Sequence, residues 1–347
     1  MTRRSRLVLG CSLVAWSALA AHAVTPHWTA LTSGARATFR GVSAVSDRVA
    51  WASGSGDTVL RTLDGGETWT RVAVATDGLD FRDVDAIDAR VVYVLSIGNG
   101  PKSRIYKTTD GGATWTEQFR GDDPALFLDA MTFWDAAHGV VMADSVGGHF
   151  TILTTEDGGA HWARMPAAAL PPALENEGAF AASGTNVAVF GKNDVWIGTG
   201  ASATARVLRS HDRGRTWQVS ATPLRSGASA GIFSVAFRDA RHGVVVGGDY
   251  RKESEAVDNV AVTDDGGVTW KLIKTHGLSG FRSVVTYVPH TSASLVAVGP
   301  QGTDFSTDDG RTWTPVPGPG FHTFSFSPSG AVGFGAGARG ALGKLER

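Results

Sequence analysis

An eight-residue pattern occurs six times in this chain, and it constrains the fold more than any other feature of the sequence. Its form is [S/T]-x-D-x-G-x-[T/H]-W, and the copies are residues 62–69, 108–115, 155–162, 210–217, 263–270 and 306–313. The Asp can accept hydrogen bonds from backbone N–H groups of a tight turn, and the Gly can adopt the positive φ that such a turn requires. We therefore expect each copy, called a box below, to be a structural turn between two strands, with its Trp as a buried anchor. The box residues in question are Asp64, Asp110, Asp157, Asp212, Asp265 and Asp308, with Trp69, Trp115, Trp162, Trp217, Trp270 and Trp313.

The spacing of the boxes predicts the architecture. Their aspartates recur at intervals of 43 to 55 residues, and each interval holds short segments of alternating apolar and polar residues. In the first unit these segments are 39–45, 49–52, 59–62 and 68–72, and none has a helical period. A repeat of about this length with four short strands is typical of one blade of a β-propeller. The sequence therefore predicts an all-β fold.

The two ends of the chain predict how the ring closes. Segments that open the first strand of a unit begin at Phe39, Phe81, Phe127, Phe180, Phe233, Phe281 and Phe321. There are thus seven first strands for six boxes, and the last unit stops before a fourth strand. Residues 27–31 resemble a fourth strand that lacks its first three. We predict a seven-bladed β-propeller spanning residues 24–347 as one domain, closed by the N-terminal strand, which hides the sheet edges of an open array.

Residues 1–23 have the layout of a secretory signal peptide. Three arginines precede an apolar run from Leu7 to Ala20, and Ala21-His22-Ala23 fits a cleavage site. The run is too short for a stable membrane span. We expect cleavage before Val24 and an exported protein, periplasmic or extracellular, without a transmembrane segment in its mature form.

Composition excludes several classes of function. The one cysteine, Cys11, lies in the segment expected to be removed, so the mature chain has no thiol for a disulfide or a metal site. Lipid anchoring at Cys11 is the lesser alternative, because too few apolar residues precede it. Removal of residues 1–23 takes three arginines and no acid, so 29 basic residues face 33 acidic ones. The formal balance of −4 offers no basic footprint for nucleic acid.

Irregular loops should gather on the face opposite the boxes. In a four-stranded blade, the loops between strands two and three and the connections between blades share that face. The longest loops there are 166–178 and 247–258, and binding residues are often on loops of a rigid scaffold. The candidates on this face are Asp144, Glu175, Glu177, Asp249, Tyr250, Arg251 and Lys252.

Three arginines occupy one repeat position. Arg40, Arg82 and Arg282 each follow the Phe that opens a unit, and His322 has this place in the last unit. Equivalent positions of a propeller converge on its axis, so the three guanidinium groups could grip one anionic group. The alternative is that each Arg pairs with an acid near it, such as Asp83.

The boxes and the seven-unit plan resemble the BNR/Asp-box repeats of bacterial sialidases. They resemble still more the photosystem II assembly/stability factor family and its relatives in non-photosynthetic bacteria, over roughly residues 27–345. The resemblance implies a propeller fold. It also implies either a role in assembly through a protein partner or a sialidase-like hydrolysis of an anionic sugar, because one fold hosts both.

The catalytic set that a sialidase would need is incomplete in this sequence. By resemblance, such an enzyme requires three Arg, a Tyr nucleophile beside a Glu, an acid/base carboxyl and an Arg-Ile-Pro motif, and this motif is absent. Only Tyr250 of the four tyrosines is on a loop; a carboxyl pair would come from Asp144, Glu175, Glu177 or Asp249, and sequence does not give their separation. No nucleotide or zinc motif occurs, and one carboxylate per box is too few for calcium, so we expect no cofactor or metal. We expect an exported, non-enzymatic monomer that binds a protein partner, with a sialidase-like glycoside hydrolase as the alternative.

Overall fold

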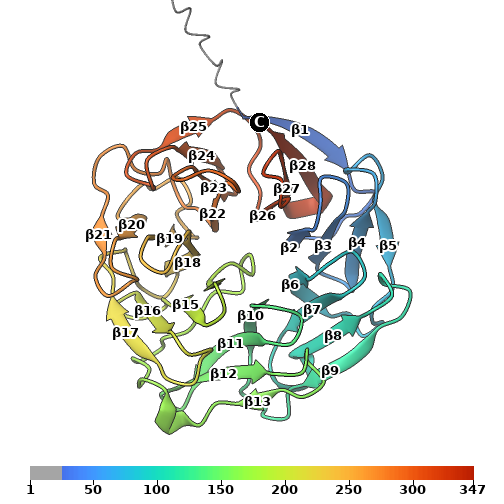
Figure 1. Ribbon diagram of the computed structural model, residues 1–347, viewed down its shortest axis with the longest axis horizontal. Coiled ribbons are helices and arrows are strands. Elements are labelled where there is room, and N and C mark those ends of the chain that lie inside the picture. The colour runs from blue at the N-terminus through green and yellow to red at the C-terminus, as the bar shows by residue number, and fades with distance from the viewer. Residues whose placement is uncertain (1–25) are drawn as a thin grey trace, which may run out of the picture.

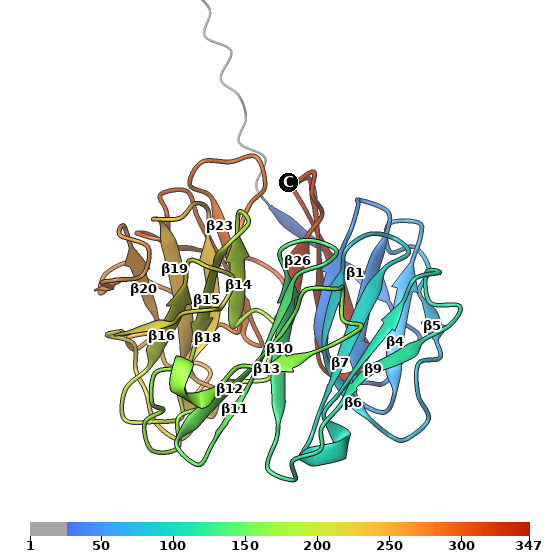
Figure 2. The same ribbon diagram turned by 60° about the horizontal axis from the view of Figure 1, so that its bottom comes forward.

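Seven antiparallel sheets of four strands surround a central axis in the computed structural model, which describes residues 26–347 (Figures 1 and 2). Within these residues the elements are strands and three short 3-10 turns, η1 (Gly100–Lys102), η2 (Ala167–Ala169) and η3 (Ala338–Gly340). The predicted seven-bladed all-β propeller is confirmed. The predicted signal peptide, residues 1–23 with Cys11, lies outside the described residues. Among residues 26–347 there is no helix of the length and apolarity that crossing a bilayer requires.

The first three blades follow the chain from the axis outward. Blade 1 is β2 (Phe39–Ala44), β3 (Ala50–Gly54), β4 (Thr58–Thr62) and β5 (Thr70–Val72). Blade 2 is β6 (Asp80–Ala86), β7 (Val92–Ile97), β8 (Arg104–Thr108) and β9 (Thr116–Arg120). Blade 3 is β10 (Leu128–Phe133), β11 (Gly139–Val146), β12 (His149–Thr155) and β13 (Ala163–Arg164).

The next three blades repeat this order. Blade 4 is β14 (Val187–Phe190), β15 (Asp194–Gly198), β16 (Arg206–Ser210) and β17 (Gln218–Ala221). Blade 5 is β18 (Ala230–Phe237), β19 (Gly243–Asp249), β20 (Val260–Thr263) and β21 (Lys271–Leu272). Blade 6 is β22 (Val284–Tyr287), β23 (Leu295–Gly299), β24 (Gly302–Ser306) and β25 (Thr314–Val316).

Blade 7 joins the two ends of the chain. It consists of β26 (Thr323–Phe326), β27 (Val332–Ala336), β28 (Ala341–Glu346) and, as its outer strand, β1 (His27–Thr32). β1 runs antiparallel to β28, from the pair His27 and Glu346 to the pair Thr32 and Ala341. The predicted closure by the N-terminal strand is therefore what the topology has (Figure 1).

The boxes form one kind of turn and attach each blade to the preceding one. In the first box, the backbone N–H of Thr68 donates to Asp64 Oδ1 at 2.9 Å, and the N–H of Gly66 donates to the Thr62 hydroxyl at 2.9 Å. The same two bonds recur in the other five boxes. Two of the indoles lie edge-on to a ring of the preceding blade, Trp69 to Phe334 of blade 7 and Trp115 to Trp51 of blade 1, with ring centroids 6.1 Å apart in both pairs.

The box tryptophans are less buried than the sequence predicted. Trp217 and Trp313 are buried, at 8% and 5% exposure, whereas the other four are half-buried. In the two buried indoles, Nε1 donates to a carbonyl of the same box, from Trp217 to Gly214 at 2.7 Å and from Trp313 to Gly310 at 2.9 Å. The expectation of a buried anchor therefore holds in full for two of the six boxes.

The first strand predicted for the fourth unit is wrong. Residues 180–183 are not a strand; β14 begins at Val187, and residues 178–186, called the channel segment below, cross the axis of the ring (yellow-green near the centre of Figure 1). Other blades hold the segment by hydrogen bonds. The Ser183 hydroxyl donates to the Ser283 carbonyl of blade 6 at 2.8 Å, and Arg82 Nη1 of blade 2 donates to the Ala181 carbonyl at 3.1 Å. The channel segment therefore lies across the axis of the ring and is not part of blade 4.

Candidate functional site

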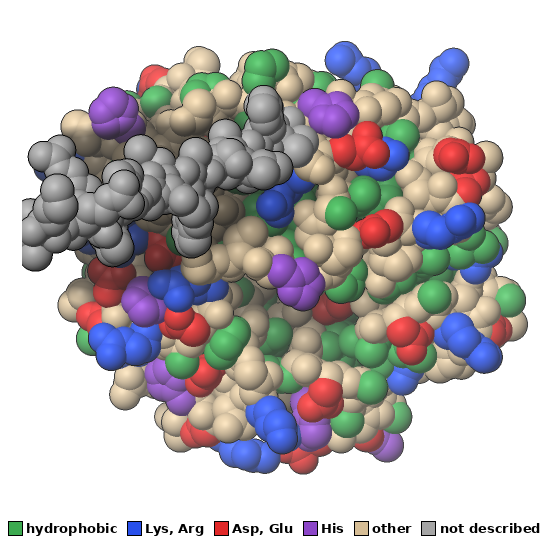
Figure 3. All heavy atoms as spheres, turned by 45° about the horizontal axis from the view of Figure 1, so that its top comes forward, with side chains coloured by type: hydrophobic (Ala, Val, Ile, Leu, Met, Phe, Trp, Pro, Cys, Tyr) green, Lys and Arg blue, Asp and Glu red, His purple; other side chains and the backbone are tan. Residues whose placement is uncertain are grey.

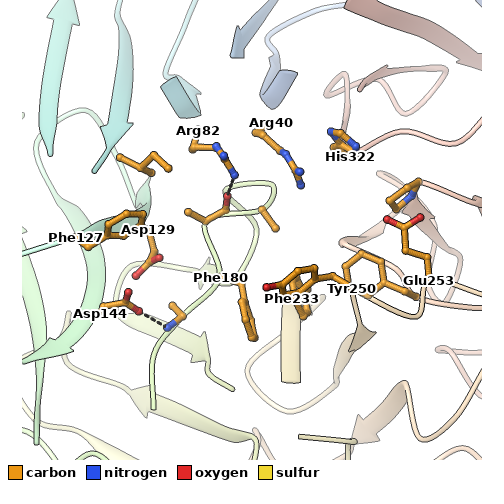
Figure 4. A pocket seen from close by; sticks show the side chains of 16 residues that line it. Arg40, Arg82, Phe127, Asp129, Asp144, Phe180, Phe233, Tyr250, Glu253 and His322 are labelled. Carbon is orange, nitrogen blue, oxygen red and sulfur yellow. Dashed lines mark hydrogen bonds between the residues drawn. The ribbon is translucent and has the colours of Figure 1, made fainter. Parts of the chain in front are cut away.

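Four inner strands have a β-bulge at the same place, near the end that lies away from the boxes. The residue without a cross-strand partner is Arg40 in β2, Arg82 in β6, Asp129 in β10 and Phe233 in β18. A bulge redirects the side chain of its extra residue, and bulges are common next to functional sites. All four of these side chains line one pocket on the axis (Figure 4). The repeated bulge therefore directs these four side chains into the pocket.

The pocket is a hollow of about 400 Å³ on the face opposite the boxes. Its volume is in the range of ~300–1,000 Å³ that is usual for ligand sites. The channel segment forms its floor, and loops between strands two and three of blades 5 and 6 form one side. The lining residues are Arg40, Arg82, Ile97, Phe127, Asp129, Asp144, Ala179, Phe180, Ala181, Ala182, Phe233, Tyr250, Glu253, Phe281, Pro300 and His322.

Five of the residues that the sequence predicted for the binding face meet in this pocket. They are Arg40, Arg82, Asp144, Tyr250 and His322. Among the lining aromatic residues, Phe180 stacks on Phe233 with ring centroids 4.0 Å apart, and Tyr250 packs edge-on against both. The Tyr250 side chain is 41% exposed at the rim. The pocket thus combines charged groups with an aromatic surface.

Arg282 does not reach the pocket, so the expected cluster of three arginines contains two. The residue is 1% exposed, and its guanidinium lies against Asp304, with Nε and Nη2 at 2.8 and 2.7 Å from Oδ2. Asp304 belongs to β24 of the same blade. For Arg282 the alternative weighed from the sequence, a local ion pair, therefore holds.

The remaining predicted residues lie outside the pocket. Glu177 is buried in an ion pair with Arg206 and accepts a hydrogen bond from the Thr199 hydroxyl at 2.6 Å. Asp249 lies 3.5 Å from Arg225. Glu175, Arg251 and Lys252 are exposed on the loops around the pocket. Glu177 and Asp249 therefore have structural partners and are not free for a ligand.

The basic wall of the pocket is formed by Arg40 and Arg82. Arg82 is partly neutralised, because its Nε and Nη2 both lie 2.9 Å from Asp80 Oδ2. Within residues 26–347, the Arg40 guanidinium has no hydrogen bond or ion pair, and its Nε is buried without a partner. Burial, together with the nearby positive charge of Arg82, lowers the pKa of Arg40 to about 10, so it remains a cation at neutral pH.

His322 contributes a neutral imidazole to this wall. Burial, followed by repulsion from Arg40, lowers its pKa to about 4. Its Nδ1 lies 3.2 Å from the carbonyl of Phe39. The positive charge available to a ligand is therefore that of Arg40 above all.

The acidic wall opposite consists of Asp129 and Asp144, of which the sequence predicted Asp144 but not Asp129. Asp129 is 1% exposed, and its Oδ2 has no hydrogen-bond partner in the described part of the chain. Burial, then the charge of Asp144, raises the pKa of Asp129 well above its usual value; burial raises that of Asp144 to about 6. Phe127 was aligned with the Phe that opens the other units, but Leu128 occupies that register position, so Asp129 is the counterpart of Arg40. An Asp inside an otherwise apolar strand was the signal that could have revealed it.

The arrangement suits recognition of a charged, partly apolar ligand better than metal chemistry. In residues 26–347 no group of three or more His, Cys, Asp or Glu side chains is placed to hold a metal ion. On the face that Figure 3 shows, basic and acidic side chains are interspersed over the visible surface without an extended patch of one sign. Separate groups of basic and of acidic side chains are therefore found in the pocket, and not on the face that Figure 3 shows.

The fold and the repeated turns define the class of protein: a seven-bladed β-propeller with a box in six blades and an axial pocket. No family model matches the sequence, and no curated protein matches it either. Several solved structures are similar to this chain. A structure of YCF48 bound to a D1 peptide is 19% identical, with a TM-score of 0.62 over 92% of this chain and 97% of that chain.

Two further structures show how widely the fold is shared. YCF48 from Cyanidioschyzon merolae is 18% identical, with a TM-score of 0.63 over 92% of this chain and 98% of that one. A GH74 xyloglucanase from Xanthomonas campestris is 16% identical, with a TM-score of 0.63 over 92% of this chain but 53% of that one. At these identities the likeness is one of fold. A peptide-bound protein and a glycoside hydrolase both have it.

Proposed function

We propose that this chain is an exported, non-enzymatic propeller that binds a protein partner by seating an acidic segment of that partner in the axial pocket. The observation that carries the proposal is the Arg40 guanidinium, which lines the pocket beside Arg82 and has no hydrogen bond or ion pair in residues 26–347, although Asp80 and Glu253 attract it from a greater distance. A largely buried charge without a partner is costly, and a carboxylate ligand would remove that cost while forming bidentate hydrogen bonds.

The aromatic side chains favour a peptide as the ligand. Phe180, Phe233 and Tyr250 offer an apolar surface next to the two arginines, and aromatic residues are enriched at the core of protein interfaces. YCF48, which has the same fold, has been solved with a D1 peptide. By the family resemblance, the role would be the assembly or stability of an envelope or membrane complex. The signal-peptide pattern of residues 1–23 supports a periplasmic or extracellular location.

A glycoside hydrolase is the second candidate, and the acidic wall is the observation in its favour. Asp129 and Asp144 share the pocket with two arginines, and raised carboxyl pKa values are common in catalytic acids. However, the third arginine of a sialidase-like set is absent from the pocket, since Arg282 is bound to Asp304. The two carboxyls also lie on neighbouring strands of one wall instead of flanking a sugar.

Site-specific photocross-linking in the source cells would test the proposal. p-Benzoylphenylalanine at position 250 places the reactive group at the pocket rim, whereas the same residue at position 268, an exposed Val in the fifth box, places it on the other face. We expect a discrete cross-linked partner from position 250, none from position 268, and loss of the partner when Arg40 and Arg82 are both changed to Gln. An identical product from both positions, or one that survives the double Gln change, would refute binding through this pocket.

An activity assay separates the two candidates. The purified protein should release no fluorophore from a sialoside or from a panel of other aryl glycosides between about pH 4 and pH 8. Release that disappears in Asp144→Asn would establish the hydrolase instead.

A further inference from the structure

The acidic wall of the pocket has few contacts with the rest of the fold. Neither Asp129 nor Asp144 takes part in an ion pair within residues 26–347, although both are at least partly buried. Asp144 accepts one hydrogen bond, from the Ala179 N–H of the channel segment at 3.2 Å. Asp129 Oδ2 accepts none. A buried carboxyl such as that of Asp129, which holds nothing in place, is costly to retain, so we look for its use in what enters the pocket.

The geometry restricts what that ligand group can be. Figure 4 shows Asp129 and Asp144 on one side of the pocket and Arg40 with His322 on another, with Phe180 and Phe233 nearby. A metal ion is a poor fit, because hard cations take six or more oxygen ligands and no third acidic or imidazole side chain completes a group here among the described residues. An ammonium or guanidinium group fits better, since two carboxylates satisfy its donors and its positive charge.

We propose that Asp129 and Asp144 form a second subsite that accepts a Lys or Arg side chain of the same peptide whose acidic group binds Arg40 and Arg82. This inference rests on the proposed function, and it specifies the ligand: a short segment with an acidic and a basic group separated by apolar side chains. The aromatic surface between the two walls would contact the intervening residues. A segment with acidic groups alone would leave the acidic wall unpaired and repel it.

A defined peptide library would test the subsite. Peptides built from Lys, Glu, Phe, Gly and Ser at random positions are selected on the immobilised wild-type propeller and on two variants, Asp129→Asn/Asp144→Asn and Arg40→Gln/Arg82→Gln. The Asn changes keep the size of each side chain and remove a buried ionisable carboxyl, so the acidic-wall variant should fold; thermal unfolding checks this. We expect the wild type to select Glu and Lys together at a constant spacing. The first variant should lose the preference for Lys and the second the preference for Glu.

A double-mutant cycle on one selected peptide makes the contact specific. Replacement of its Lys by norleucine should weaken binding to the wild type by about tenfold or more, but to Asp129→Asn/Asp144→Asn by less than about twofold. Equal losses for both proteins would overturn the subsite. Selection of Glu without Lys by the wild type would also overturn it while leaving the proposed function standing. Selection of no peptide at all would overturn both.

Discussion

Arg40 and Arg282 each follow the Phe that opens a unit, but they differ in their surroundings. We therefore expect their replacement to change the free energy of unfolding differently. Arg282 and Asp304 form an ion pair in which both side chains are almost fully buried, at 2% and 0% exposure. Arg40 has no partner. Arg282→Met should therefore lower the free energy of unfolding by about 3–5 kcal/mol, because it leaves the Asp304 charge buried alone. Arg40→Met should leave it unchanged or raise it, within about 1 kcal/mol.

Urea unfolding of the two variants would measure this difference, with each Met serving as the control for the other. The Arg40 variant should fold normally and still lose the cross-linked partner. A large destabilisation by Arg40→Met would mean that its guanidinium has a structural partner and is not free to bind a ligand.

Asp83 predicts how stability depends on pH. It is 4% exposed beside the channel segment, and burial raises its pKa to about 8, despite a hydrogen bond from the Met131 N–H at 2.7 Å. The unfolded value is about 3.9, so between these two pH values the folded state binds the extra proton. The free energy of unfolding should therefore fall as the pH rises from about 4 to about 8.

Asp83→Asn should flatten this dependence, because the amide stays neutral. Between about pH 4.5 and pH 8.5 the free energy of unfolding should fall by at least about 1.4 kcal/mol more in the wild type than in the variant. This difference corresponds to one pKa unit. Asp64→Asn is the matched control: hydrogen bonds from Thr68 lower the pKa of Asp64 to about 2, so its contribution is lost only as the pH falls below about 4. Parallel pH profiles for wild type and Asp83→Asn would contradict the prediction.

Among individual residues, the sequence predicted part of the site. Arg40 and Arg82 could be found because a Phe-Arg pair repeats in register. Arg282 has the same local sequence, but its partner Asp304 is 22 residues away in another strand, and no short-range pattern reports that contact. Asp129 was missed because Phe127, one position early, imitates the Phe that opens the other units.

At the scale of elements, the box joins a hydrogen-bonded turn to an interface between blades. The indole of Trp313 packs among Val244 and other buried residues of blade 5, and its Nε1 donates to the Gly310 carbonyl at 2.9 Å. The indole of Trp69 is half-buried, and its Nε1 has no partner in the described residues. The same position in two boxes therefore contributes differently to stability.

Trp313→Ala should lower the free energy of unfolding by about 3–5 kcal/mol, as expected for a buried indole, whereas Trp69→Ala should cause a clearly smaller loss. Differential scanning calorimetry of both variants, with Thr68→Ser as a mild control in the first box, would measure this. Equal losses would show that the turn, and not the burial of the indole, determines the contribution of a box.

Strands were predictable because alternation and turn residues are local signals. The channel segment was not. Phe180-Ala-Ala-Ser183 has the composition of an opening strand, yet Phe180 stacks on Phe233 of another blade and Ser183 bonds to blade 6. Gly184, at φ +77°, turns the chain against Asp83 where a Cβ would come within 2.1 Å of Oδ1. These contacts between distant residues decide the conformation, and a sequence window does not contain them.

For the whole molecule, stability depends on a ring that the strand β1 must close. Trp28 of β1 lies 4.6 Å from Phe321 between ring centroids, and its Nε1 donates to the Thr303 hydroxyl of blade 6 at 3.2 Å. Leu31 packs with the cluster that joins blades 7 and 1. β1 therefore links three blades, and without it the backbone groups of β28 form an open edge that other chains can pair with.

A chain that starts at Gly34 should consequently unfold at a lower temperature and associate through β28. Light scattering coupled to size exclusion would report the association, and thermal unfolding the loss of stability. A synthetic peptide of residues 24–33, added in trans, should restore a monomer and raise the unfolding temperature with increasing concentration, because it binds the folded state alone. A scrambled peptide of the same composition should do neither. Only the native order pairs six residues with β28 so that Trp28 and Leu31 reach the residues they pack against. If the shortened chain were monomeric with the unfolding temperature of the full one, closure by β1 would not be what holds the ring together.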